Sequence, residues 1–161
     1  MKVRDIMTRD VVSGRKEMDI GSAARLMLEG GFGTLPVIDG HGKLAGIITD
    51  RDIAMAAALR QRNASHIRVH EALRQTLFTC FAEDDILTAL KQMQKGRVRR
   101  LPVVDEGEHL RGIVSVDDIA LRAVGQPGGV SAEAFVDVIK RICAQPSLEP
   151  AVEFPDTFVS G

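Results

Sequence analysis

The sequence predicts an α/β protein made of two tandem copies of a strand–helix–strand–strand–helix unit, packed with pseudo-twofold symmetry and followed by a C-terminal helix and tail. The chain matches itself at an offset of 66 residues without a gap, and residues 3–58 share 18 identities in 56 positions with the second copy. Unrelated stretches of ordinary composition share about three or four. Two copies without a third favour a paired module over a solenoid. We therefore divide the chain into a first motif at 1–62, a second at 63–124 and a C-terminal segment at 125–161.

The first half of each copy predicts a short β-segment and then a helix. Val11-Val12 and Leu77-Phe78 are the β-segments, and Asp19 and Asp85 are expected to cap the helices that follow. Apolar residues then recur at the i, i+3, i+4, i+7 spacing of one helical face. Glycines at 30 and 96 stand where a helix C-terminus favours a positive φ.

The second half of each copy predicts two strands and a second helix. In the first copy, residues 35–38 form a short β-branched run, whose proline suits a strand start or edge. A turn at 39–42 leads to a partner strand at 44–48, and Thr49 caps a helix from Asp50 to about Arg60. This order predicts two small sheets backed by helices.

The segments outside the copies are simpler. Residues 61–68 are expected to form a polar linker, and 126–129 break the chain. Residues 132–144 predict an amphipathic helix with Phe135, Val136, Ile139, Ile142 and Cys143 on one face. The last stretch, with its three prolines, is expected to be extended or disordered.

Composition excludes several functional classes. The net charge is −1, and Trp and Tyr are absent, so a nucleic-acid partner is unlikely on charge and stacking grounds. No run approaches the length of a membrane span, and two isolated cysteines without a secretory leader indicate a reducing, cytoplasmic location. We expect no metal site and no catalytic residues, because no ligand spacing or nucleophile–base motif is present.

A hydroxyl and an acid recur where a strand turns into a helix, as Thr49-x-x-Asp52 and Ser115-x-x-Asp118. One interpretation is a capping box, which only starts a helix. The other is a ribose-phosphate site, in which helix amides and the hydroxyl bind phosphate and the acid accepts from the ribose hydroxyls. Both interpretations remain open on the sequence.

Apolar residues near these corners could form a slot for a flat base. They are Val11, Val12, Leu35 and Pro36, with the counterparts Leu77, Phe78, Leu101 and Pro102. The alternative is that they belong to the core.

The pattern Leu-Pro-Val-(Ile/Val)-Asp followed by Gly-Ile-(Ile/Val)-(Thr/Ser)-x-x-Asp-Ile-Ala, at 35–54 and 101–120, resembles the CBS (cystathionine β-synthase) domain family. The resemblance covers about residues 3–124. It implies two clefts between the copies that bind adenosine-containing ligands such as AMP, ATP, NAD or S-adenosylmethionine as regulators, not as catalytic cofactors. It also implies a homodimer in the form of a four-motif disc, and signal transduction to a regulated enzyme or transporter.

The copies differ in charge around the corners. Arg51 in the first copy is replaced by Asp117 in the second. The second copy has Arg97, Arg99 and Arg100 just before its Leu-Pro, where the first copy has Gly31, Gly33 and Thr34, and these arginines could serve either site. We expect two unequal sites, the better phosphate site including Arg51 or the Arg99-Arg100 pair. The competing hypothesis is a ligand-independent interaction or dimerisation module in which the repeated corners are only helix caps.

Overall fold

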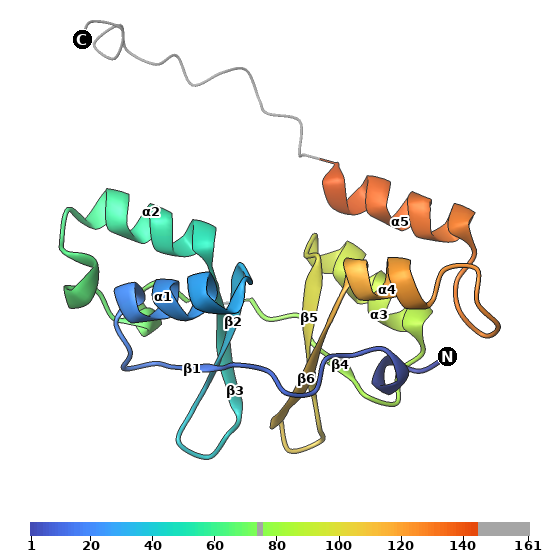
Figure 1. The fold of residues 1–161 in the computed structure, drawn as a ribbon, viewed down its shortest axis with the longest axis horizontal. Helices are drawn as coiled ribbons and strands as arrows, with labels where there is room; N and C mark the ends of the chain where they lie inside the picture. Colours follow the sequence, from blue (N-terminus) through green and yellow to red (C-terminus); the bar gives the residue numbers. More distant parts are fainter. Residues whose placement is uncertain (74–75, 145–161) are drawn as a thin grey trace, which may run out of the picture.

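The computed structural model describes residues 1–73 and 76–144, and it contains two three-stranded sheets, each with its own helices (Figure 1). The expected α/β architecture is confirmed. The first half consists of β1 (Gly14–Arg15), α1 (Ile20–Gly30), β2 (Thr34–Ile38), β3 (Leu44–Thr49) and α2 (Asp50–Arg60). The second consists of β4 (Cys80–Phe81), α3 (Ile86–Gly96), β5 (Arg100–Val104), β6 (Leu110–Ser115) and α4 (Val116–Arg122), followed by α5 (Ala132–Cys143). Three short 3₁₀ turns are η1 (Val3–Asp5), η2 (Ala64–His66) and η3 (Val69–Glu71).

Both sheets have the same topology. In each, the short first strand runs parallel to the middle strand, and the middle and last strands form an antiparallel hairpin. Pro36 lies within the middle strand β2, but β1 pairs with that strand only from Val37 onward. Pro36 has no N–H to donate, and on the β1 side it has no paired residue. The strand is therefore locally an edge at this position, where proline is tolerated.

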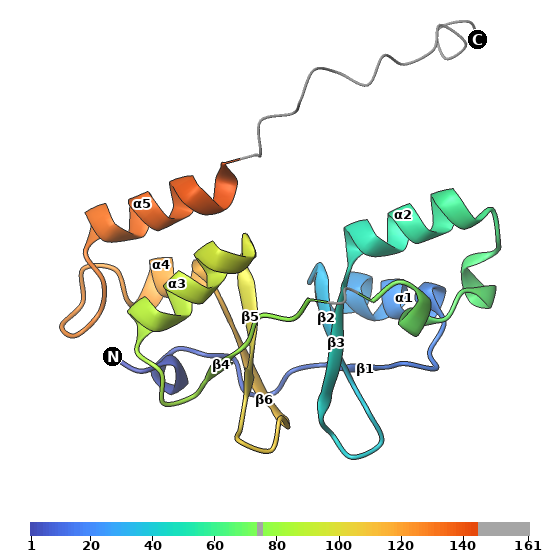
Figure 2. The same cartoon turned by 180° about the vertical axis from the view of Figure 1, so that it is seen from behind.

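The repeat units exchange their first segments in space. The amides of Val3 and Arg4 donate to the carbonyl oxygens of Asp84 and Ala82, at 2.9 and 3.0 Å, so the N-terminus packs on the second half. The start of the second copy packs on the first half in return, because the amide of Val69 donates to the carbonyl oxygen of Met18 at 2.8 Å. In Figure 2 the N-terminal segment, in dark blue, starts beside β4 and the rest of the second half and then crosses to β1 in the first half.

The cores reflect this exchange. Val3 and Ile6 are buried with the second-half residues, whereas Ile67 and Val69 are buried with the first-half residues. The glycines at 46 and 112 make room for the crossing segments. A Cβ at Gly46 would stand 2.9 Å from Cδ1 of Leu73, and one at Gly112 would stand 2.7 Å from the carbonyl oxygen of Thr8.

Several local predictions need correction. The first strands lie at 14–15 and 80–81, three residues after Val11-Val12 and Leu77-Phe78, because parallel pairing with the middle strand is available only there. The left-handed residues that end α1 and α3 are Gly31 and Arg97, at φ 67° and 49°. Each lies one position later than the predicted glycine.

The helix caps and the C-terminal helix also differ in detail. Asp19 accepts from the amide of Ser22 as expected, but no side-chain cap forms at Asp85. Helix α5 forms as predicted and packs on α3, yet Val136 and Cys143 are exposed. The buried face includes Val138, which the prediction omitted. The prediction for the proline-containing tail lies outside the described residues. None of the described helices has the length and hydrophobicity of a membrane span.

Candidate functional site

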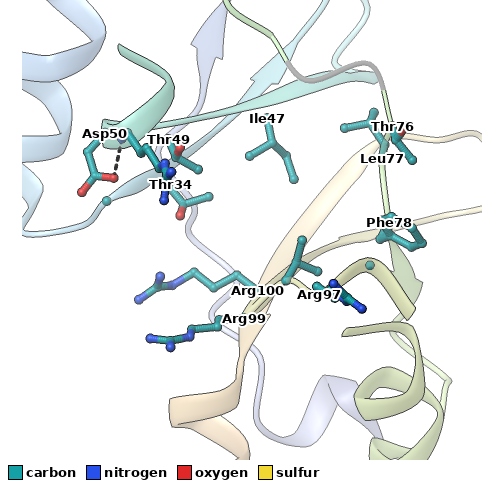
Figure 3. A pocket seen from close by; sticks show the side chains of 14 residues that line it. Thr34, Ile47, Thr49, Asp50, Thr76, Leu77, Phe78, Arg97, Arg99 and Arg100 are labelled. Atoms are coloured by element: carbon teal, nitrogen blue, oxygen red, sulfur yellow. Dashed lines mark hydrogen bonds between the residues drawn. The ribbon is translucent and has the colours of Figure 1, made fainter. Parts of the chain in front are cut away.

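A cavity of about 790 Å³ lies between the two halves and is lined by both of them (Figure 3). The first half contributes Gly33, Thr34, Ile47, Thr49, Asp50 and Arg51. The second contributes Thr76, Leu77, Phe78, Gly96, Arg97, Val98, Arg99 and Arg100. A volume of roughly 300–1,000 Å³ is typical of small-ligand sites. The repeat therefore builds a ligand-sized space at its own junction.

The Thr49 corner is a complete capping box. The amide and hydroxyl of Thr49 both donate to Oδ2 of Asp52, at 2.9 and 2.6 Å, and the amide of Asp52 donates to Oγ1 of Thr49 at 3.2 Å. Ser115 and Asp118 repeat the arrangement at 2.9, 2.6 and 3.1 Å. The capping interpretation is confirmed at both corners, and the hydroxyl protons are already donated to carboxylates.

The amides that open α2 are also partnered, which corrects one part of the phosphate hypothesis. The amide of Asp50 donates to the carbonyl of Gly33 at 3.2 Å. The amide of Arg51 donates to Oδ1 of Asp50 at 2.7 Å, the contact drawn in Figure 3. An anion in this cavity cannot rely on these amides as donors. Its donors in the observed arrangement are the guanidinium groups.

Four arginines line the cavity. Arg51 lies on α2, Arg97 and Arg99 lie between α3 and β5, and Arg100 is the first residue of β5. Figure 3 shows Arg99 and Arg100 extending toward the Thr34 side, whereas Arg97 lies on the side of Phe78. Arg100 approaches Asp117 at 3.6 Å, and Arg99 donates to Sγ of Cys143 on α5 at 3.5 Å.

Apolar side chains form the other part of the lining. Leu77 and Phe78 lie together on one wall, with Ile47 on the strand facing them (Figure 3). The Phe78 ring packs against Gly96, where an added Cβ would come within 2.5 Å of Cδ2 of the ring. This glycine holds the ring at the cavity wall.

The predicted site residues separate into three groups. Thr49, Arg51, Leu77, Phe78, Arg99 and Arg100 meet in the cavity. Leu35 and Leu101 have no exposed surface, and Pro36 and Pro102 are buried, so the core interpretation holds for these four and the slot prediction is corrected. Val11, Val12, Asp52, Ser115 and Asp118 are not among the residues that line this cavity, although Asp52 is hydrogen-bonded to Thr49, which does line it.

Some lining residues were missed from the sequence, namely Gly33, Thr34, Ile47, Asp50, Thr76, Gly96 and Val98. Ile47 could have been found, because it stands two residues before Thr49 on one strand and shares its face. The others carry no sequence signal of their own, because their place in the lining depends on how the two halves pack against each other.

The two cysteines are chemically different. Burial raises the pKa of the Cys80 thiol to about 12, whereas Cys143 is exposed at the end of α5. No group of three or more His, Cys, Asp or Glu side chains within 1–73 and 76–144 is arranged to hold a metal ion.

Comparison with known proteins gives the family. The CBS domain model matches residues 3–59 and 69–125. The chain belongs to the CBS domain family. The CBS domain-containing protein YhcV of Bacillus subtilis is 32% identical over 130 residues, covering 81% of this chain and 91% of YhcV. A homoserine O-acetyltransferase of Methanococcoides burtonii is 37% identical over 117 residues, which cover 73% of this chain but 23% of the transferase. The chain thus spans about a quarter of the length of such enzyme-named relatives.

A solved CBS pair has the same arrangement. The CBS domain pair of protein MJ0100, in complex with 5′-methylthioadenosine and S-adenosyl-L-methionine, superposes with a TM-score of 0.68 at 29% identity. The match covers 75% of this chain and 94% of that one.

Proposed function

We propose that this chain is a regulatory, ligand-sensing module that binds an adenosine-containing ligand in the cavity between its halves. The observation that carries the proposal is the joint lining of one ligand-sized cavity by apolar side chains, the Thr49 corner and four arginines. The MJ0100 pair, which binds two adenosine compounds, supports the ligand class. AMP, ATP, NAD and S-adenosylmethionine are the candidates.

The lining suggests a pose for such a ligand. Ile47, Leu77 and Phe78 are suited to contact a purine ring. Asp52, next to Arg51 in the chain, is proposed to accept from the ribose. The guanidinium groups are proposed to bind the anionic part. The module is proposed to act on a partner enzyme or transporter through the ligand and not to catalyse a reaction itself.

Binding can be tested by calorimetry and by thermal unfolding with each candidate ligand. A ligand present at 100 times its dissociation constant stabilises the folded protein by about 2.7 kcal/mol. For a chain of this size, that corresponds to a rise in Tm of about 5–10 °C. Neither heat nor a Tm shift with any of the four ligands would contradict the proposal.

The matched variants Asp52→Ala and Asp118→Ala separate binding from folding. Both remove the same capping box and should cost about 1 kcal/mol each of unfolding free energy. Only Asp52→Ala, at the Thr49 corner, should weaken binding in this cavity. Equal affinities for the two variants would remove Asp52 from the proposed site.

A second candidate function, assembly, has its own observation. Helices α1 and α2 leave Leu28 and Leu59 82% and 74% exposed. In the second half α5 packs on α3, and Leu121 on α4 is 83% exposed. Apolar patches of this kind mark interaction surfaces. We propose a homodimer that uses the α1–α2 face, and sedimentation of the wild type and of Leu28→Glu tests it. We also expect a cytoplasmic location, which the two free cysteines support.

A further inference from the structure

Positive charge is concentrated in the cavity, although the chain as a whole is nearly neutral. Its lining contains the four arginines and one acidic residue, Asp50, which gives a formal charge of +3 (four minus one). The whole chain carries −1. A concave site with one sign of charge attracts ligands of the opposite sign.

The repeat fold does not require these arginines. At the offset of 66 residues, Arg97, Arg99 and Arg100 correspond to Gly31, Gly33 and Thr34, and Arg51 corresponds to Asp117. The connection from α1 to β2 forms in the first half without the charges of Arg97, Arg99 and Arg100, and α4 begins in the second half without an arginine at the position of Arg51. The arginines therefore belong to this one cavity and not to the architecture of the motif.

Arg97 is retained at a conformational cost. It occupies the left-handed region at φ 49°, where the first copy has Gly31 at φ 67°. A side chain with a Cβ is strained in this region relative to glycine. Its backbone fills the same role as that of Gly31, since both amides cap the preceding helix. Compared with Gly31 in the first copy, Arg97 adds a guanidinium group and changes nothing in the helix cap.

Arg51 and Arg97 differ from the other two arginines. Within the described parts of the chain, their guanidinium groups form no ion pair and no hydrogen bond. They come from opposite walls, Arg51 from the first half and Arg97 from the second. Asp117, the partner of Arg100, is exposed and its carboxylate stands at 3.6 Å, so this pair is weak and can exchange for a ligand oxygen. An anion with several oxygens could engage both walls at once.

We propose that the cavity selects an adenosine ligand with a polyphosphate tail, a nucleoside di- or triphosphate, over neutral adenosine and over the positively charged S-adenosylmethionine. This inference rests on the proposed function, since it names the ligand class of the same site. Each added phosphate brings negative charge to the arginines, whereas a sulfonium group adds to their repulsion. ATP should bind at least about tenfold more tightly than adenosine, and S-adenosylmethionine should bind more weakly than ATP by more than that factor.

The test is calorimetric titration of the full chain with ATP, ADP, AMP, adenosine and S-adenosylmethionine at low and high salt. Affinity should follow the number of phosphates, and only the affinities of the charged nucleotides should fall as salt rises. Adenosine or S-adenosylmethionine binding as tightly as ATP would overturn the polyphosphate inference but leave the proposed function intact. Binding of none of the five would overturn both.

Variants isolate the charge from the fold. Arg97→Gly restores the residue of the first copy and relieves the left-handed strain, so it should fold at least as well as the wild type. Combined with Arg51→Gln, it should weaken ATP about tenfold or more and leave adenosine unchanged. Arg25→Gln, an exposed arginine on α1 outside the cavity, is the control and should change neither. An unchanged ATP affinity in the double variant would refute the inference.

Discussion

Gly46 and Gly112 lie against the segments by which each half packs on the other copy, and substituting them tests that packing directly. Gly46 and Gly112 occupy the same position of the repeat, and both lie in extended strands. At Gly46 the nearest atoms to an added methyl group belong to the Leu73 side chain, at 2.9 and 3.0 Å. At Gly112 the nearest atom is the main-chain oxygen of Thr8, at 2.7 Å. The same substitution therefore meets a movable side chain in one half and backbone in the other.

The difference in cost follows from what must move. In Gly46→Ala, Leu73 is half-buried and can change rotamer, at a cost of about 1 kcal/mol. The lower chain entropy of alanine in the unfolded state offsets about 0.5–1 kcal/mol of this. In Gly112→Ala, the main chain at Thr8 must retreat, which strains its two hydrogen bonds with Ile113, both 2.9 Å long. Overpacking of about 1–3 kcal/mol and two weakened bonds of about 1 kcal/mol each give a net loss of about 2–4 kcal/mol.

The assay is urea unfolding of the two alanine variants beside the wild type, with Tm as a second measure. Gly46→Ala should unfold close to the wild type. Gly112→Ala should lower Tm by roughly 5–15 °C for a chain of this length. If Gly46→Ala is the more damaging variant, or if both equal the wild type, the N-terminal segment does not lie against β6 as described.

Three further predictions concern the helix face, acid sensitivity and the thiols. Ile142→Ala should lower the free energy of unfolding by about 2–4 kcal/mol, because the Ile142 side chain lies in the core and is only 8% exposed. Val136→Ala should change the same free energy by about 0.5 kcal/mol or less, because Val136 is 47% exposed. Equal losses in the two variants would contradict the observed orientation of α5. The amide of His109 and the Arg111 guanidinium hold the pKa of Asp105 below its usual range. An acid with a depressed pKa stabilises the fold above its unfolded pKa of about 3.9. The difference in urea midpoint between wild type and Asp105→Asn should therefore shrink as pH falls below about 4, and a constant difference would refute this. With a thiol reagent, Cys143 should react at once and Cys80 only after unfolding; immediate reaction of two thiols would show that Cys80 is not buried.

The sequence predicted the repeated parts of the fold well because periodicity reports directly on them. The hairpin at 34–49 and the helix from Asp50 to Arg60 lie where the apolar pattern and the Thr49 cap placed them. The first strands were misplaced by three residues. Two-residue strands have no periodicity of their own, and their position depends on pairing with a distant segment.

The site was only partly predictable for a similar reason. Thr49 and Arg51 were found because they belong to a local strand-to-helix motif that recurs. Leu35 was assigned to the site because apolar residues in a core and in a binding slot look alike in sequence. Arg97 was a candidate in the sequence, but its left-handed backbone and the wall that it lines are known only from the structure.

The exchange of segments also bears on how the module could signal. Each half is completed by residues of the other copy, so the halves are not independent bodies, and the cavity lies at the junction that joins them. A ligand that contacts both walls favours the arrangement in which the walls stand at the right distance, and it can shift the molecule only by its difference in affinity between arrangements. Arg99 connects this junction to the surface, because it lines the cavity and donates to Cys143 at the end of α5. In the proposed function, a ligand oxygen that binds Arg99 competes with this contact, and the expected result of occupancy is a change at the end of α5.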